Sequence, residues 1–322
     1  MYDPMTLTLE QLESVRSDAF ADDLPIDFDK MSHWTEEQAA AYFESGGSDE
    51  PPAPAAAPPQ LPPPPPPAAH PSESAVAVPI TPLGRKPRVA LFHGTAGNEA
   101  IFKMQLGPLL RVLREAADLH FIDGTMEIDK DNSQAAAVRQ YFGDKHVLYE
   151  YARPGADERT WRTYEELDTC VERLEAALAR LPGGAADVLL GFSQGANLIT
   201  CLCARGALGQ PGAPHPFRAA VILSPTNPGW ARQRPDLFAS PITTPTIIAY
   251  SDTDTQTVTH AGCGPKEVAK LFTPAAVTLH QHSGPGHRPL PGDPSERNAF
   301  VEVVMALLAR QCPGSFEITP TD

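Results

Sequence analysis

From position 88 onward, short apolar runs alternate with longer stretches whose apolar residues recur at helical spacing. Short continuous apolar runs are typical of buried strands. These runs, together with an alternating segment at the end, predict strands over 88–92, 119–122, 187–190, 219–223, 245–250 and 277–282. The longer stretches predict helices over 100–116, 163–181, 196–203 and 299–308. Strands that alternate with helices predict an α/β fold with a mainly parallel, doubly wound sheet.

The pentapeptide Gly-Phe-Ser-Gln-Gly at 191–195 lies between a predicted strand and a predicted helix. In this context Gly-x-Ser-x-Gly is the sequence form of a nucleophile elbow, a tight turn that projects a serine hydroxyl above the sheet. Side chains at the two glycine positions would collide with the neighbouring strand and helix. By chance alone the bare pattern arises in roughly one chain in ten of this length. The surrounding strand and helix make Ser193 the candidate nucleophile.

A serine hydroxyl needs a general base, and histidine titrates in the right range to act as one at neutral pH. In folds with this elbow the chain order is serine, acid, histidine, which leaves His260, His280, His282 and His287. His280 and His282 fall inside a predicted strand, where a structural or exposed role is favoured. His287 follows Gly-Pro-Gly in a loop before the last predicted helix, from which it can reach back to the elbow. We predict His287 as the base, in preference to His282.

Two aspartates are candidates for the acid. Asp252 and Asp254 follow the predicted strand 245–250, and catalytic groups of open parallel sheets lie at such carboxyl ends. For each of them the alternative is a turn residue that caps a loop. On these grounds both aspartates stay open.

The chain from 86 to 313 resembles the eukaryotic serine hydrolase family often called FSH, a branch of the α/β-hydrolases. The resemblance rests on the segments 88–94 with Asn98, 121–123, 191–196, 251–254 and 282–287. The family's acid follows its strand after a short spacer, which maps onto Asp254. Its base is the last histidine of an H-x-G-G-H-like loop, which maps onto His287. The resemblance therefore implies an α/β-hydrolase fold with a Ser193, Asp254 and His287 triad.

The sequence departs from the family's pattern in two places. The Asp-Ala-Pro-His that usually follows the second strand is Asp-Gly-Thr-Met at 123–126, which affects the wall of an acyl pocket. Near the base, Pro285 replaces a glycine, which leaves the triad intact and alters the loop around it.

Acyl transfer also needs two backbone N–H groups where negative charge develops on the attacked carbonyl oxygen. One belongs to the residue after the nucleophile, Gln194. The loop after the first strand, His-Gly-Thr at 93–95, offers the N–H of Thr95 as the other. His93 and Gly94 are also explicable as turn residues that end a strand, but they match the family's His-Gly motif. We predict Thr95 and Gln194 as the oxyanion hole.

Residues 124–161 have no clear period and carry several large side chains. These are Met126, Tyr141, Phe142, Tyr149, Tyr151 and Trp161. Such an insertion fits a lid or one wall of an acyl pocket, and equally a long loop that buries its own aromatic residues. The sequence leaves these two alternatives open.

The first 84 residues differ in composition from the rest. They hold 14 acidic and 2 basic residues, or −12 of the chain's net charge of −15. Residues 49–84 form a linker rich in proline and alanine, which favours an extended segment without a core. The segment 1–48 carries two short helix predictions, with capping-box starts at Thr8 and Thr35. We expect a largely disordered acidic segment, with docking to a protein partner as the alternative.

These boundaries predict four parts: the acidic segment 1–48, the linker 49–84, a serine hydrolase domain at 85–313 and a short tail at 314–322. The N-terminus resembles neither a secretory signal nor a transit peptide, and no apolar run is long enough to span a bilayer. The 5 cysteines lack C-x-x-C spacing, so neither a disulfide framework nor a zinc site is indicated. We expect a cytoplasmic location, with access to the nucleus.

Together these features predict a serine hydrolase that cleaves carboxylic esters or thioesters through an acyl-enzyme on Ser193. The expected partner is a small acyl ester or thioester, with no cofactor and no metal. Nothing in the sequence resembles a phosphate loop or a basic nucleic-acid patch, so no nucleic-acid partner is expected. The alternative is a hydrolase-fold binding module, or an interaction protein that works through its N-terminal segment. The intact serine, aspartate, histidine order argues against that alternative.

Overall fold

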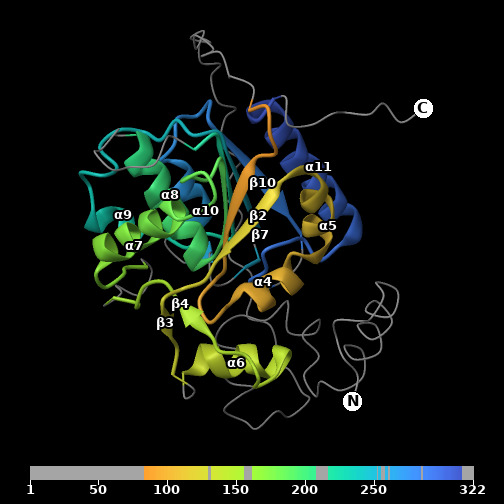
Figure 1. Cartoon of the computed structure of the whole chain (residues 1–322). Coiled ribbons are helices and arrows are strands. Elements are labelled where there is room, and N and C mark those ends of the chain that lie inside the picture. The colour runs from red at the N-terminus through yellow and green to blue at the C-terminus, as the bar shows by residue number, and fades with distance from the viewer. Residues whose placement is uncertain are drawn as a thin grey trace, which may run out of the picture. The chain divides into compact units, whose positions relative to one another are not determined.

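The structure of the chain is a computed structural model (Figure 1). It describes residues 83–129, 132–155, 162–207, 217–251, 253–254, 258–259, 262–283 and 286–313. The acidic segment 1–48 with its two predicted helices, nearly all of the linker 49–84 and the tail 314–322 lie outside the described residues. Asp252, His260, Trp161 and Pro285 also lie outside them.

A parallel sheet of 6 strands forms the centre of the described part of the chain. Its strands are β1 (Arg88–Phe92), β2 (Asp118–Ile122), β5 (Val188–Phe192), β6 (Ala219–Leu223), β7 (Thr246–Ser251) and β10 (Val277–His282). Their order across the sheet is β10-β7-β6-β5-β1-β2, and each neighbouring pair is parallel. The predicted parallel α/β architecture is confirmed, and β1, β6 and β10 have the predicted bounds.

Helices cover both faces of the sheet, as Figure 1 shows. One face carries α7 (Leu167–Ala179), α8 (Gln194–Ala207), α9 (Gly229–Gln233) and α10 (Gly264–Ala269). The other carries α4 (Glu99–Gln105), α5 (Gly107–Ala116) and α11 (Pro294–Gln311). Because both faces are covered, the central strands are apolar at nearly every position rather than at alternate ones.

Successive side chains of one strand enter different cores. In β1, Ala90 belongs to the core beneath α7 and α8, Val89 and Leu91 belong to the core beneath α5 and α11, and Phe92 belongs to both. Leu91 is in register with Leu190 of β5 and lies in the same core. Because successive side chains of a strand point to opposite faces of the sheet, one short apolar run contributes to the cores on both faces.

The helix predicted over 100–116 is two helices, with a break at Leu106. The N–H of Leu106 donates to the carbonyls of Phe102 and Met104 and ends α4. Pro108 is the second residue of α5, where its missing N–H costs nothing because the first helical turn has no partners for its N–H groups. The apolar spacing continues through the break, so periodicity alone did not reveal it.

The other three predicted helices also differ in length from their predictions, and α8 extends beyond both ends of the predicted 196–203. The helix predicted from 163 begins at Leu167, because Tyr164 instead forms an isolated β-bridge with Pro154. The closing helix is longer than predicted and begins at Pro294, after Asp293 caps it by accepting from the N–H groups of Ser295 and Glu296. No helix in the described ranges is long and apolar enough to cross a membrane.

The insertion between β2 and α7 contains structure that the sequence did not predict. It holds a two-stranded antiparallel sheet of β3 (Met126–Glu127) and β4 (Tyr149–Glu150), with α6 (Ser133–Phe142) between them. A second small antiparallel pair, β8 (Val258–Thr259) and β9 (Gly262–Cys263), follows β7.

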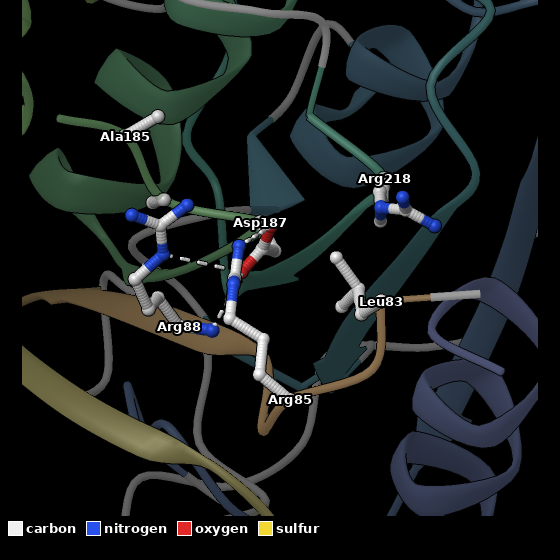
Figure 2. Close-up of a pocket in the computed structure, with 7 residues that line it drawn as sticks. Leu83, Arg85, Arg88, Ala185, Asp187 and Arg218 are labelled. Atoms are coloured by element: carbon white, nitrogen blue, oxygen red, sulfur yellow. Dashed lines mark hydrogen bonds and ion pairs between the residues drawn. The ribbon is translucent and has the colours of Figure 1, made fainter. Parts of the chain in front are cut away.

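At the amino end of the sheet, Asp187 ties β5 to the segment before β1 (Figure 2). Its carboxylate accepts from both terminal nitrogens of Arg85 at 2.7 and 2.9 Å and from the backbone N–H of Arg88 at 2.8 Å. Burial alone would raise the pKa of Asp187, but the hydrogen bonds from Arg85 and Arg88 outweigh burial and lower it. These groups line a cavity of about 340 Å³ with Leu83 and Arg218.

The strand order reverses between β1 and β5. The chain leaves β1 for β2 on one side, and after the insertion it enters β5 on the other side. Ligand sites of open α/β sheets lie beyond the carboxyl ends of the strands at such a point. His93 follows β1 there, and Ser193 follows β5.

Candidate active site

Ser193 occupies the sharp turn between β5 and α8. Its backbone φ is +52°, in the left-handed region that residues with side chains rarely adopt, and its side chain is half-buried. The turn is fixed at both ends, because Ser193 N–H donates to the Leu223 carbonyl at 2.9 Å and Asn197 N–H donates to the Ser193 carbonyl at 3.0 Å. Such backbone strain costs about 1–3 kcal/mol and is characteristic of functional sites.

The two glycines of the pentapeptide stand where no Cβ fits. A Cβ on Gly195 would lie 2.5 Å from the carbonyl oxygen of Phe92 and 2.6 Å from that of His93. A Cβ on Gly191 would lie 2.7 Å from the carbonyl carbon of Gly195. The close approach of β1, β5 and α8 therefore depends on both glycines.

His287 and Asp254 lie together although 33 residues separate them in the chain. Asp254 follows β7 and is fully buried, and His287 lies in the loop between β10 and α11. Nδ1 of His287 is 2.8 Å from Oδ2 of Asp254. Because a carboxylate only accepts, Nδ1 carries the proton and Nε2 presents a lone pair.

The His287 ring lies beside the elbow. Its centroid is 4.8 Å from that of Phe192, the residue that precedes Ser193. Nε2 of His287 is buried and makes no hydrogen bond to any described residue. The imidazole is therefore held by Asp254 on one side and has an unoccupied acceptor on the other.

The competing histidines are engaged elsewhere. Nδ1 of His282 lies 3.1 Å from the carbonyl of Ser283. The His280 ring packs against Phe300 of α11, with centroids 4.9 Å apart, and burial lowers its pKa. Among the described histidines after Ser193, the structure pairs His287 with a buried carboxylate.

The two predicted oxyanion residues lie on the two segments that meet at the elbow. Thr95 is in the loop after β1, and Gln194 begins α8. The loop after β1 approaches the elbow closely at Gly94, since a Cβ added there would be 3.2 Å from Cβ of Ser193. Within the described residues, no backbone hydrogen bond engages the N–H of Thr95 or of Gln194.

His93 is a buried structural residue. Its Nε2 accepts from the Gly124 N–H at 3.0 Å, so Nδ1 must carry the proton and donate to the Gly94 carbonyl at 2.7 Å. Burial lowers the pKa of His93 to about 4, and the ring is therefore neutral at neutral pH. This ring fixes the shape of the loop that carries Thr95.

Sequence reasoning missed two residues that support this site. Tyr151 is fully buried, and its hydroxyl bonds the ends of β1 and β2. The hydroxyl of Ser224, directly after β6, donates a hydrogen bond to the carbonyl of Arg288 in the loop that carries His287. Tyr151 was noted only as one aromatic residue of the insertion, and no sequence signal distinguished Ser224 from other turn residues.

The insertion buries apolar residues of its own, which is one of the two alternatives that the sequence left open, and a lid or a wall of an acyl pocket stays a prediction. Its residues Ile128, Ala135 and Leu148 form a small core of their own with Ala96 and Ile101. The backbone of Tyr149 also pairs with Gly97, two residues after Thr95. The insertion thus buries apolar side chains of its own and pairs with the loop after β1. Tyr141, by contrast, is 49% exposed.

No group of three or more metal-ligating side chains lies together within the described ranges.

Parts of the chain are similar to known proteins. The human protein named esterase OVCA2 is 28% identical over 234 residues, which cover 68% of this chain and 95% of that protein. The mouse protein of the same name is 29% identical over 231 residues, which cover 67% of this chain and 94% of that protein. Among solved structures, maize acyl-protein thioesterase 2 covers 71% of this chain and 97% of its own, with 18% identity and a TM-score of 0.47.

A family model described as serine hydrolase (FSH1) matches residues 82–288. The match covers more than half of the chain and includes Ser193, Asp254 and His287. The resemblance stated from the sequence motifs is confirmed, and with it the α/β-hydrolase fold. This chain belongs to the FSH1 serine hydrolase family.

Proposed function

We propose that the domain at 85–313 is an esterase that hydrolyses carboxylic esters or thioesters through an acyl-enzyme on Ser193. The observation that carries this proposal is the 2.8 Å contact between His287 and the buried carboxylate of Asp254, beside a serine on a strained turn. Family membership and the esterase name of the relatives support the same reaction class.

In the acylation step, Ser193 Oγ attacks the acyl carbonyl carbon while Nε2 of His287 takes the hydroxyl proton. Asp254 keeps Nδ1 protonated and stabilises the imidazolium that forms. When the tetrahedral intermediate collapses, the bond to the leaving oxygen or sulfur breaks. His287 then returns the proton to the leaving alcohol or thiol.

In the deacylation step, water attacks the ester on Ser193. His287 takes a proton from the water and delivers it to Ser193 Oγ as the acyl bond breaks, which releases the acid and restores the enzyme. The N–H groups of Thr95 and Gln194 donate to the carbonyl oxygen when it becomes negative in each step.

Labelling with a fluorophosphonate tests the nucleophile directly. The reagent phosphonylates an activated serine, and mass spectrometry of the peptides identifies the residue. We expect one adduct, on Ser193, that forms more slowly after Asp254→Asn. An adduct on another residue would contradict the assignment.

A panel of p-nitrophenyl esters and acyl thioesters of increasing chain length then tests the substrate class. The esterase proposal expects turnover that is lost after prior phosphonylation of Ser193. A protein that binds these acyl compounds without turnover would instead support a hydrolase-fold binding module.

A further inference from the structure

The hydroxyl of Tyr151 joins the ends of two strands. It accepts from the backbone N–H of His93 at 2.9 Å and donates to the carbonyl of Ile122 at 2.6 Å. Burial raises the pKa of Tyr151 well above its ordinary value, so the phenol keeps the proton that it donates. One buried hydroxyl therefore satisfies both a donor at the end of β1 and an acceptor at the end of β2.

The Tyr151 ring also holds the side chain of His93. The two rings stack with centroids 4.6 Å apart and an interplanar angle of 29°. The neutral imidazole in turn donates to the Gly94 carbonyl at 2.7 Å, directly before Thr95. The peptide that leads to the Thr95 N–H is thus fixed through His93 by contacts that begin at Tyr151.

The backbone of Tyr151 meets the other side of the elbow. Its N–H donates to Oε1 of Gln194 at 2.8 Å, and Nε2 of Gln194 donates to the carbonyl of Ala152 at 2.7 Å. Gln194 is 2% exposed, so these hydrogen bonds are shielded from solvent. The side chain of Gln194 therefore anchors the first residue of α8, whose own N–H is the second proposed oxyanion donor.

We propose that Tyr151 is a positioning residue that fixes the spacing of the Thr95 and Gln194 N–H groups, so that the insertion sets the geometry of the oxyanion hole. This inference rests on the function proposed above. It gives the insertion a defined role, because the residue directly after β4 contacts His93, which leads to Thr95, and Gln194.

The physical basis is preorganisation. Oxyanion donors stabilise charge that exists only in the transition state, and removal of one donor costs about 10²–10³ in kcat. Loss of the hydroxyl displaces the Thr95 donor through His93 and leaves the backbone bond from Tyr151 to Gln194 in place, so it lowers kcat more than it changes KM. Loss of the hydroxyl also leaves the His93 N–H and the Ile122 carbonyl without partners, which lowers stability.

Tyr151→Phe, compared with Tyr164→Phe, tests the inference. Tyr164 is also buried in the same core, and its hydroxyl accepts from Asn197 at 2.8 Å. We expect kcat to fall about tenfold or more in Tyr151→Phe, in line with partial loss of oxyanion stabilisation, with KM close to the wild-type value. Tyr164→Phe should keep kcat close to that of the wild type. Equal kcat in the two variants would overturn the inference.

A trifluoromethyl ketone separates a positioning role from a merely structural one. It adds to the serine and places a negative oxygen in the oxyanion hole, whereas a methyl ketone of the same length binds without that charge. We expect affinity for the fluorinated ketone to fall in Tyr151→Phe by the same factor as kcat, and affinity for the methyl ketone to change little. A parallel loss for both ketones would overturn the inference.

Gln194→Met is the second variant, because it removes both side-chain bonds and keeps the backbone N–H. We expect a similar loss of kcat, and a double variant with Tyr151→Phe that loses less than the product of the two factors. If Tyr151→Phe does not fold, Gln194→Met is tested with the two ketones instead. A loss of affinity for the trifluoromethyl ketone alone would support the inference, and a parallel loss for both ketones would overturn it.

Amide hydrogen exchange gives a readout that does not depend on esterase activity. Exchange in segment 93–98 should rise in Tyr151→Phe and stay unchanged in Tyr164→Phe. If the wild-type protein shows no ester turnover, the proposed function is refuted. If exchange in segment 93–98 still rises in Tyr151→Phe and not in Tyr164→Phe, the positioning role of Tyr151 is supported. Unchanged exchange in Tyr151→Phe would refute the positioning role in an active enzyme.

Discussion

The hydroxyl of Ser224 donates a 2.9 Å hydrogen bond to the carbonyl of Arg288, the residue directly after His287. Ser224 is 1% exposed, has φ +46° and is fixed at the end of β6 by its N–H, which donates to the Ala249 carbonyl at 2.8 Å. The loop that carries His287 is therefore attached to the same edge of the sheet that carries Ser193.

Removal of this bond should affect both the stability of the fold and the position of the base. Ser224→Ala leaves the Arg288 carbonyl without its donor, which costs about 1–3 kcal/mol in the free energy of unfolding. We expect kcat to fall severalfold with little change in KM, measured by steady-state ester hydrolysis and urea unfolding. Ser224→Gly is the control, because it relieves the positive φ but also lacks the hydroxyl. Full kcat in the glycine variant would show that the hydroxyl does not position His287.

Asp254→Asn should nearly abolish turnover while it preserves the shape of the site. An asparagine amide can donate to Nδ1 of His287, which moves the imidazole proton to Nε2 and removes the base. The corresponding change in a well-studied triad lowers kcat about 10⁴-fold. His282→Gln is the control and should retain activity, because His282 contacts the Ser283 carbonyl instead of a carboxylate. Loss of activity in the control with retention in Asp254→Asn would reverse the assignment of the base.

The elbow glycine Gly195 should not tolerate even a methyl group. Gly195→Ala places a Cβ 2.5 Å from the Phe92 carbonyl oxygen, so β1 and α8 must separate. We expect a large loss of stability, measured by thermal unfolding, and a large loss of activity, measured by ester hydrolysis. Gly107→Ala is the matched control, since no atom lies within 4 Å of the added Cβ at the start of α5. Because alanine has a higher helix propensity than glycine, we expect no loss in the free energy of unfolding of this control and a gain of at most about 1 kcal/mol.

Stability should depend on pH through His93. A histidine in the unfolded chain titrates near 6.5, whereas the pKa of His93 in the folded protein is about 4. Between these values the unfolded state binds a proton that the folded state does not, so the free energy of unfolding falls as pH falls through this window. The full difference is about 3 kcal/mol. His93→Gln should flatten this slope in urea unfolding between pH 7 and pH 4, and an unchanged slope would contradict the assignment.

The sequence was most informative where one local rule decides the structure. The apolar runs identified the strands because burial on both faces requires apolar side chains at successive positions. The glycine spacing identified the turn at Ser193, because a Cβ at Gly191 or Gly195 would collide with backbone. These features are encoded by short segments, so a single sequence reveals them.

The rest depends on contacts between distant segments. The break at Leu106 is hidden by apolar spacing that continues through it, and α6 packs on residues that no period connects to it. The role of Tyr151 follows from partners 29 and 58 residues away, and that of Ser224 from a carbonyl 64 residues away. Such partners share no pattern along the chain, and tertiary structure is needed to find them.

The most direct test of the proposed mechanism is the kcat of Ser193→Ala on an ester that the wild-type protein hydrolyses. We expect a folded variant with the melting temperature of the wild type and a kcat lower by several orders of magnitude, about 10⁶ for the serine of a well-studied triad. A folded Ser193→Ala protein that retains most of its ester turnover would contradict the assignment of Ser193, because the nucleophile would then be another group.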